Sequence, residues 1–146
     1  MQNKYFELEP ILKEKIESIP EIIQVHTPFS VDDLFDLPIS DNGVGIIYVG
    51  DRVGESVANG KATELFQQWL VVLVVDDASA QFEGTMSIRQ KADPLICALL
   101  SALQGFNPKL PHYKPLKRVE AGVKVGSLSG SAYFPFLFEA QVLRAY

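Results

Sequence analysis

The feature that most constrains the fold is an unbroken apolar run at residues 69–75, Trp-Leu-Val-Val-Leu-Val-Val. β-Branched and aromatic residues of this kind favour strands. Since successive side chains of a strand point to opposite faces of a sheet, both faces of this run are apolar and both have to be covered. The sequence therefore predicts a long interior strand from about Leu65 to Val75, whose amphipathic first half could project beyond the sheet.

Two segments are suited to cover this strand as helices. Apolar residues recur every three or four positions across residues 5–19, which places them on one face of a helix. A second helix is predicted across residues 82–104, where Asp93 and Pro94 mark a kink or a restart. Gly105 is its predicted C-cap.

Further strands are predicted at residues 22–25, 44–49, 116–125 and 132–140. The last of these is apolar at every second position, as expected for a strand with one buried face. Pro135 cannot donate a backbone hydrogen bond, so it should lie at an edge or a bulge.

Three shorter segments connect these elements. Ser30, followed three residues later by Asp33, predicts the N-cap of a short helix. The glycines and polar residues of Gly50–Lys61 indicate a polar loop, and those of Gly126–Ser131 indicate a flexible turn.

Together these elements predict an α+β fold similar to an α/β sandwich, with a mixed and mostly antiparallel sheet packed against the two main helices. The whole chain, residues 1–146, is expected to form a single domain. Its core is expected to contain Leu70, Val72, Leu73, Val74, Leu99, Leu103, Phe136 and Phe138.

The composition limits the compartment. One cysteine rules out an internal disulfide and predicts a reducing compartment such as the bacterial cytoplasm. The polar N-terminus lacks the apolar segment of a signal peptide, and the run 69–75 is much too short to span a bilayer. We therefore expect no association with a membrane.

Charge is unevenly distributed along the chain. The net charge is −5, whereas residues 109–124 carry +4, which leaves −9 for the remainder. Neutralising phosphates requires a net basic face, so the overall charge disfavours nucleic-acid binding by the whole domain. The basic segment is either a solvated surface or a patch that meets an acidic neighbour.

Residues that could carry catalysis are scarce. The segment Gly54–Lys61 fails as a phosphate-binding loop, because its glycine spacing is wrong and Ala62 replaces the hydroxyl that binds magnesium. His26 and His112 have no partners at the spacing of metal ligands. Cys97 is predicted to be a buried, inert thiol. No catalytic, cofactor-binding or metal residue is assigned, and no cofactor is expected.

Several local patterns resemble one known family. After an amphipathic first helix, these are Gly-Ile-Ile-Tyr-Val-Gly-Asp at 45–51, Gln-Trp-Leu-Val-Val-Leu-Val at 68–74, the helix end at 94–106, and the aromatic-proline strand at 132–139. In this order, over nearly the whole length, the chain resembles the tail terminators of Mu-like and lambda-like bacteriophages.

The resemblance implies a structural virion protein of a phage or prophage and not an enzyme. Proteins of this family form a hexameric ring that caps the tail tube, ends tail polymerisation and provides the head-tail joining surface. The implied partners are further copies of the chain, the tail tube protein and a head-completion or connector protein, while DNA only passes through the lumen. The implied location is the tail end of the virion, and the bacterial host cytoplasm before assembly.

The family has no catalytic motif, so the resemblance implies no active-site residue. Ring-interface positions carry no clear sequence motif, so the expected subunit-interface residues rest on physical arguments alone. They are Asp51, Arg52, Glu55, Trp69 and Arg118. Arg118 is expected to pair with Asp51, Glu55 or Asp77 of a neighbouring copy, because a guanidinium can make two parallel bonds to a carboxylate.

Two other hypotheses stay open at this point. One is a small α/β enzyme or ligand-binding domain with its site near Asp76, Asp77 and the Gly50–Gly60 segment. The other is a different neck or connector protein with a related fold.

Overall fold

The computed structural model describes residues 4–38, 42–76, 86–128 and 130–145. Its elements follow in the order α1 (Leu8–Glu17), β1 (Gln24–His26), α2 (Val31–Asp36), β2 (Gly43–Val57), the 3₁₀ helix η1 (Ala58–Gly60), β3 (Ala62–Asp76), α4 (Met86–Leu103), β4 (Lys117–Val119), β5 (Gly126–Leu128) and β6 (Ser131–Ala145).

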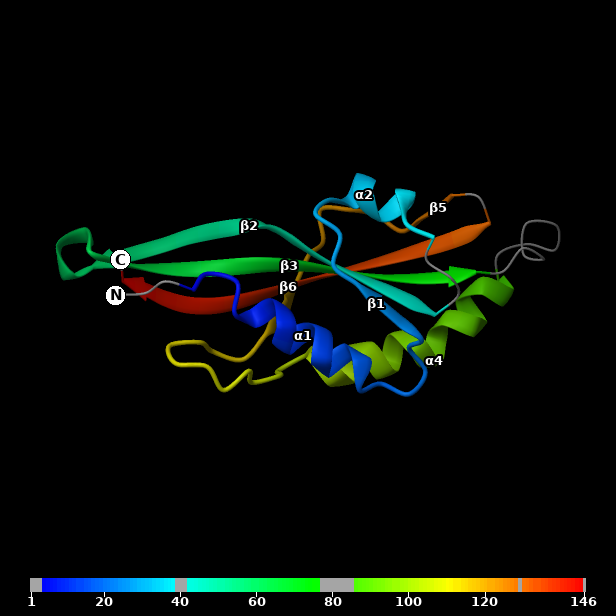
Figure 1. Ribbon diagram of the computed structural model, residues 1–146, viewed down its shortest axis with the longest axis horizontal. Helices are drawn as coiled ribbons and strands as arrows, with labels where there is room; N and C mark the ends of the chain where they lie inside the picture. The colour runs from blue at the N-terminus through cyan, green and yellow to red at the C-terminus, as the bar shows by residue number, and fades with distance from the viewer. Residues whose placement is uncertain (1–3, 39–41, 77–85, 129, 146) are drawn as a thin grey trace.

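Three strands run the length of an elongated molecule (Figure 1). β2, β3 and β6 each contain 15 residues, which corresponds to about 50 Å at the usual rise per residue. The strand order is β1-β2-β3-β6-β4, and β5 also pairs with β6. β1 lies parallel to β2, and the other described pairs are antiparallel. The predicted α+β fold with a mixed, mostly antiparallel sheet is confirmed.

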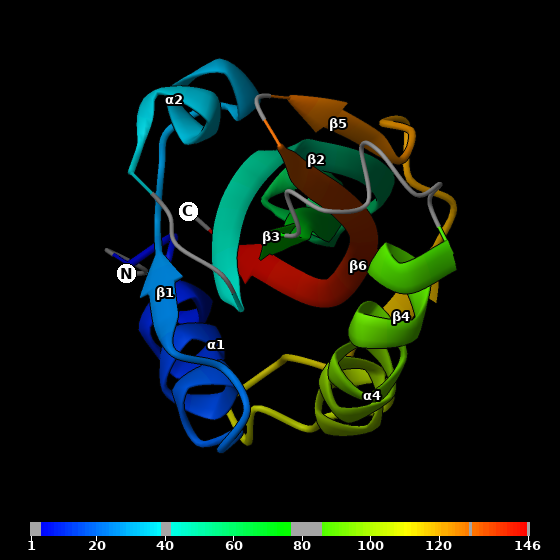
Figure 2. The same ribbon diagram turned by 90° about the vertical axis from the view of Figure 1, so that its right-hand side faces the viewer.

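The larger core lies between the sheet and the two main helices, α1 and α4, which lie below the sheet in Figure 2. Alternate residues of β6 from Ala132 to Ala140 face this core, as the sequence predicted. All eight residues predicted for the core are buried. Two of them, Leu70 and Val72, belong to a smaller cluster on the opposite face of the sheet.

The smaller cluster forms under α2. Leu34 of this short helix packs with Ile47, Leu70 and Leu137. A Cβ atom at Gly45 would lie 2.5 Å from the Leu34 side chain, so glycine at this position lets α2 approach β2. The apolar half of β3 is therefore covered on both faces, as its sequence required.

Residues typical of helix caps correctly predicted the start of α2 and the end of α4. The Ser30 hydroxyl accepts a hydrogen bond from the Asp33 N–H at 3.2 Å and donates one to the Asp33 carboxylate at 2.9 Å, which confirms the predicted N-cap. Pro94 lies inside α4, which is a single helix and does not restart there. Gly105 follows α4 with φ +72°, as a C-terminal glycine should.

The prediction of a polar loop at residues 50–61 is wrong. β2 continues to Val57 and pairs with β3 down to the turn at η1. Glycine marks irregularities of this ribbon and not a loop: Gly50, with φ +129°, follows a register shift, and a Cβ at Gly54 would lie 3.1 Å from Phe66. The segment is polar because, in the part of the chain that the structure describes, no helix or strand covers one face of the ribbon there.

The strand predicted at residues 116–125 is mostly absent, and the turn predicted at 126–131 is partly a strand. β4 pairs with residues 137–139 of β6, and β5 pairs with residues 131–133. Pro135 lies opposite the gap between them, because it has no N–H to offer a further partner. We call residues 117–128 the arm.

β1 also differs from its prediction, because it begins two residues later than the strand predicted at 22–25.

The position of Leu99 generates a stability prediction. Its side chain is fully buried between α4 and the sheet, so Leu99→Ala should lower the free energy of unfolding by about 2–5 kcal/mol. Urea denaturation followed by circular dichroism measures this. Cys97→Ala, on the exposed side of the same helix, should change the free energy by less than about 0.5 kcal/mol. Equal effects of the two substitutions would contradict the packing of α4.

Candidate subunit interface

The two edges of the sheet differ. The outer edge of β6 is covered by β5, by β4 and by residues 112–114, where the Lys114 N–H bonds the Gln141 carbonyl at 2.9 Å. The outer edge of β2 is paired with β1 only at residues 43–45. Among the described residues, none pairs through its backbone with the rest of this edge. We call residues 46–57 the β2 edge; it presents free N–H and C=O groups to a further strand.

Apolar side chains gather beside the β2 edge. Phe29 is 93% exposed, and Val53 is 66% exposed. A cleft of about 290 Å³ lies between Phe29, β2 and α1, lined by Phe6, Glu9, Thr27, Pro28, Phe29, Ile46 and Tyr48. An exposed phenylalanine next to an unpaired strand is typical of a surface that another protein covers.

Asp51, a predicted interface residue, is half-buried and held within its own subunit. Its carboxylate accepts a hydrogen bond from the Tyr48 hydroxyl at 2.7 Å and another from the Tyr5 hydroxyl. Burial, together with the hydrogen bond to Asp51, raises the pKa of Tyr48 well above its usual value. The carboxylate ties the segment before α1 to β2.

Arg52, also a predicted interface residue, belongs to a cluster that crosses three strands. Its guanidinium donates to both carboxylate oxygens of Glu139 on β6, at 3.2 and 3.1 Å, and lies 3.9 Å from the centre of the Phe66 ring on β3. Gln68 donates to the same carboxylate at 2.9 Å. These hydrogen bonds, with Arg52 as the main cause, lower the pKa of Glu139.

The remaining predicted residues lie in different environments. Glu55 is exposed on the β2 edge. Trp69 is 0% exposed and packs between Phe6 and Tyr48, with ring centres 6.4 and 5.3 Å away. Trp69 can therefore affect a contact with a neighbouring subunit by positioning the Phe6 and Tyr48 rings that cover it.

Arg118 lies on β4, at the edge of the sheet opposite to β2. Its guanidinium is exposed and lies 5.1 Å from the centre of the Phe136 ring. The structure does not bring Arg118 near Asp51 or Glu55 of its own chain, since β2 and β4 flank opposite sides of the β3–β6 pair. Asp77, its third predicted partner, lies outside the described residues.

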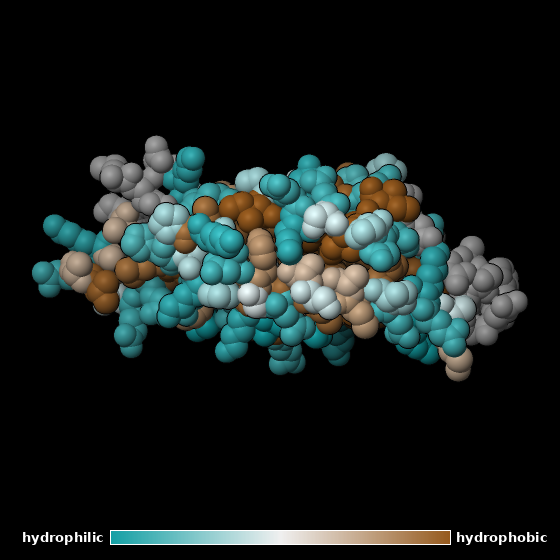
Figure 3. Space-filling view, turned by 90° about the horizontal axis from the view of Figure 1, so that it is seen from below, coloured by the Kyte–Doolittle hydropathy of each residue, from teal (hydrophilic) through white to brown (hydrophobic). Residues whose placement is uncertain are grey.

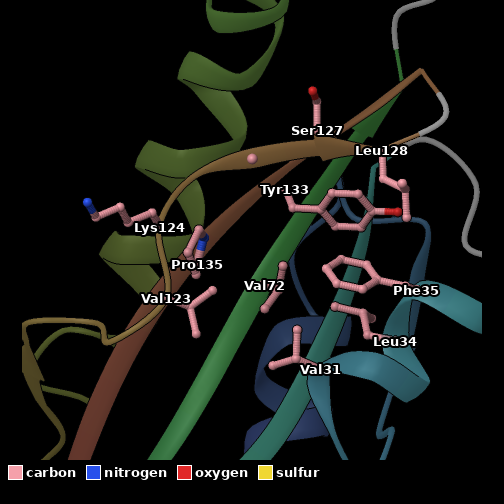
Figure 4. Close-up of a pocket in the computed structure, with 11 residues that line it drawn as sticks. Val31, Leu34, Phe35, Val72, Val123, Lys124, Ser127, Leu128, Tyr133 and Pro135 are labelled. Carbon is pink, nitrogen blue, oxygen red and sulfur yellow. The ribbon is translucent and has the colours of Figure 1, made fainter.

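The arm and α2 enclose an apolar groove of about 190 Å³ (Figure 4). Val31, Leu34 and Phe35 of α2 face Val72 and Tyr133 of the sheet across it, with the Phe35 and Tyr133 rings 4.9 Å apart. The arm contributes Val123 and Leu128, while the Lys124 side chain points away from the aromatic pair. The apolar side chains that line this groove come from both the arm and α2, and their packing holds the arm in position.

Sequence reasoning missed a buried arginine. Arg144 is 1% exposed and donates to the backbone carbonyls of Lys4 and Tyr5, to the Glu7 carboxylate and to the Tyr113 hydroxyl, at 2.5–3.1 Å. It faces the larger core because it continues the alternation of β6. This alternation could have predicted the burial of Arg144 from the sequence, since the even-numbered residues of β6 face the core.

The enzyme hypothesis required a site that the structure does not assemble. Asp76 ends β3, whereas residues 50–60 lie beside the other half of this strand: Gly50, the nearest of them, lies opposite Gln68, about 26 Å along β3 from Asp76. Asp77 lies outside the described residues. Cys97 is exposed and not buried as predicted, because the buried face of α4 comprises Ala92, Leu95, Leu99 and Leu103. In the described part of the chain, no three potential metal-ligating side chains form a group.

The face formed by α1 and α4 is mainly hydrophilic, with hydrophobic side chains in separate patches (Figure 3). No helix in the described ranges is long and apolar enough to cross a membrane.

An α+β subunit with an open sheet edge and exposed apolar side chains beside it has the features of a protein that assembles with others. The family model described as phage tail terminator protein matches residues 1–146. The chain therefore belongs to the phage tail terminator family, a family of structural virion proteins and not of enzymes. Its role is structural and lies in the phage tail. Comparison with curated proteins gave no match.

The lowered pKa of Glu139 predicts a specific pH dependence. Since the carboxyl of folded Glu139 titrates below that of the unfolded chain, its stabilisation is fully present above the unfolded pKa of about 4.3 and is lost as pH falls through the folded pKa. Glu139→Gln should therefore destabilise the protein at pH 7, and the difference from wild type should shrink below about pH 4. Thermal unfolding across pH measures it, with exposed Glu120→Gln as the control. A constant difference would contradict the pairing with Arg52.

The buried Arg144 yields a second prediction. Arg144→Met leaves the Glu7 carboxylate without its partner, so the free energy of unfolding should fall by about 3–5 kcal/mol. Adding Glu7→Gln removes that charge, and the double variant should be more stable than Arg144→Met alone. Guanidinium denaturation tests both, with exposed Arg89→Met as the control. A double variant that is less stable than Arg144→Met would refute the account.

Proposed function

We propose that this protein caps the tail tube of a phage or prophage as a homo-oligomeric ring of six copies. The observation that carries the proposal is the match of the tail terminator family to the full range 1–146. In this proposal the ring ends tube polymerisation because the side that faces away from the tube does not offer the surface on which a further ring of tube protein would stack.

The shape of the subunit supports a ring. Closed rings need heterologous contacts, in which one patch on a subunit meets a different patch on the next. The open β2 edge and the basic β4 side provide two different patches on opposite sides of one sheet. Of the predicted interface residues, Glu55, Arg52 and Arg118 are exposed at these two sides. Asp51 and Arg52 also shape the β2 side through contacts within the subunit.

The two faces of the ring would have different partners. One face binds the tail tube protein, and the other provides the joining surface for a head-completion or connector protein. DNA passes through the lumen without specific contact. Free subunits are present in the host cytoplasm before assembly, and the ring remains at the tail end of the virion afterwards.

Electron microscopy tests this function. Negatively stained protein should show six-fold rings with a central hole. Tails assembled without the protein should be overlong and heterogeneous, and added protein should restore a uniform length. Antibody labelling at the neck, beyond the tube end, would instead indicate the alternative connector role. Tubes of unchanged length in the absence of the protein would refute capping.

The charge of Arg118 generates a prediction about assembly. Arg118→Glu should shift the equilibrium from rings towards monomers, and more strongly at low salt, because salt screens exposed charges. Analytical ultracentrifugation at several salt concentrations measures the shift. Arg89→Glu, an equal charge change at an exposed position of α4, is the matched control. An oligomer distribution unchanged by Arg118→Glu at every salt concentration would exclude this residue from the interface.

A further inference from the structure

We propose that the arm of one subunit docks along the β2 edge of the next, so that the sheets continue around the ring. This inference rests on the proposed ring and specifies which surfaces of the subunit form it. The occupant of the β2 edge is a second copy of this chain.

The positions of the two surfaces carry the first step. The β2 edge and the arm lie along opposite edges of the sheet, as the strand order β1-β2-β3-β6-β4 requires. Within one subunit they cannot meet. Between subunits they form a heterologous contact that repeats in one direction and can close into a ring.

Backbone hydrogen bonding provides the second step. Residues 46–57 have no backbone partner on their outer side among the described residues. In the arm, residues 120–125 lie between β4 and β5 and belong to neither strand. Residues 122 and 123 form a bend in the free subunit, and straightening this segment against the β2 edge would let the two satisfy each other by strand addition.

The exposed apolar side chains provide the third step. The β2 edge presents the exposed Val49 and Val53, and the exposed Phe29 lines a cleft with Ile46 and Tyr48 of the same strand. The arm presents Val125, which is 63% exposed, whereas Val123 and Leu128 line the groove that the arm shares with α2. An apolar residue on an added strand suits a pocket beside the receiving edge, and the cleft of about 290 Å³ next to Phe29 is such a pocket.

Charge complementarity provides the fourth step and favours a second copy over another protein. The arm carries exposed Lys117, Arg118 and Lys124 against one acid, Glu120. The β2 edge carries the exposed Glu55. Both complementary surfaces belong to the same chain, so each copy supplies what the next one needs.

Cross-linking between engineered cysteines tests the contact. In a Cys97→Ser background, Val53→Cys and Val125→Cys are combined in one chain and treated with a short bismaleimide at concentrations where rings form. The expected result is a ladder of cross-linked species that ends at the ring size. Each single variant alone should give no ladder, and an equal mixture of the two should give dimers only.

Matched controls separate the outcomes. Val125→Cys combined with Met86→Cys, an exposed position on α4, should not cross-link. Rings without a ladder would overturn the docking of the arm while leaving the proposed cap intact. Monomers at every concentration, in isolation and on tail tubes, would overturn both. Cross-linking of Val53→Cys to the tube protein instead of to the arm would assign the β2 edge to that partner and refute the proposal.

A charge exchange provides an independent measurement. Glu55→Lys and Lys124→Glu should each reduce ring formation, because each places like charges at the proposed contact. A mixture of the two variants should recover rings, since opposite charges then meet at every contact. Failure of the mixture to assemble, with both variants folded, would overturn the proposed pairing.

Discussion

The rest of the structure depends on the pairing of β3 with two strands at once. β3 bonds to β2 on one side and to β6 on the other along nearly its whole length. Its apolar half creates two cores, one under α1 and α4 and one under α2. Where β3 becomes amphipathic, the helices no longer cover both faces, and polar clusters such as Arg52–Glu139 replace the smaller core.

Hydrophobic periodicity predicted much of this arrangement. The interior strand, both main helices and the buried face of β6 could be identified because their patterns repeat over nine or more residues. The predictions failed where a pattern had two interpretations. Residues 50–57 are polar and contain glycine, which suits a loop as well as a solvent-exposed ribbon with bulges. Only pairing with β3, a contact distant in sequence, decides between them.

The interface residues were harder to predict for a similar reason. A tryptophan on a strand is suited equally to a core and to a contact surface, and the tertiary packing of Phe6 and Tyr48 places Trp69 inside. Phe29 was not predicted as an interface residue, because a single aromatic residue beside a proline forms no repeating hydrophobic pattern. Its exposure depends on where the chain crosses from β1 to α2. Arg144 shows the converse, since strand alternation makes even a charged residue interior.

The long pairing of β3 with β6 also has a consequence for how the chain folds. Ala62 pairs with Ala145, 83 residues later, and the whole strand pair consists of such distant contacts. Folds dominated by distant contacts form slowly. Until β6 has been synthesised, the Val-rich half of β3 can pair only with β2 and lacks one neighbour. During translation, this segment is the part of the chain most exposed to misassociation, so chaperone dependence should be sensitive to substitutions in β6 more than to those in α1.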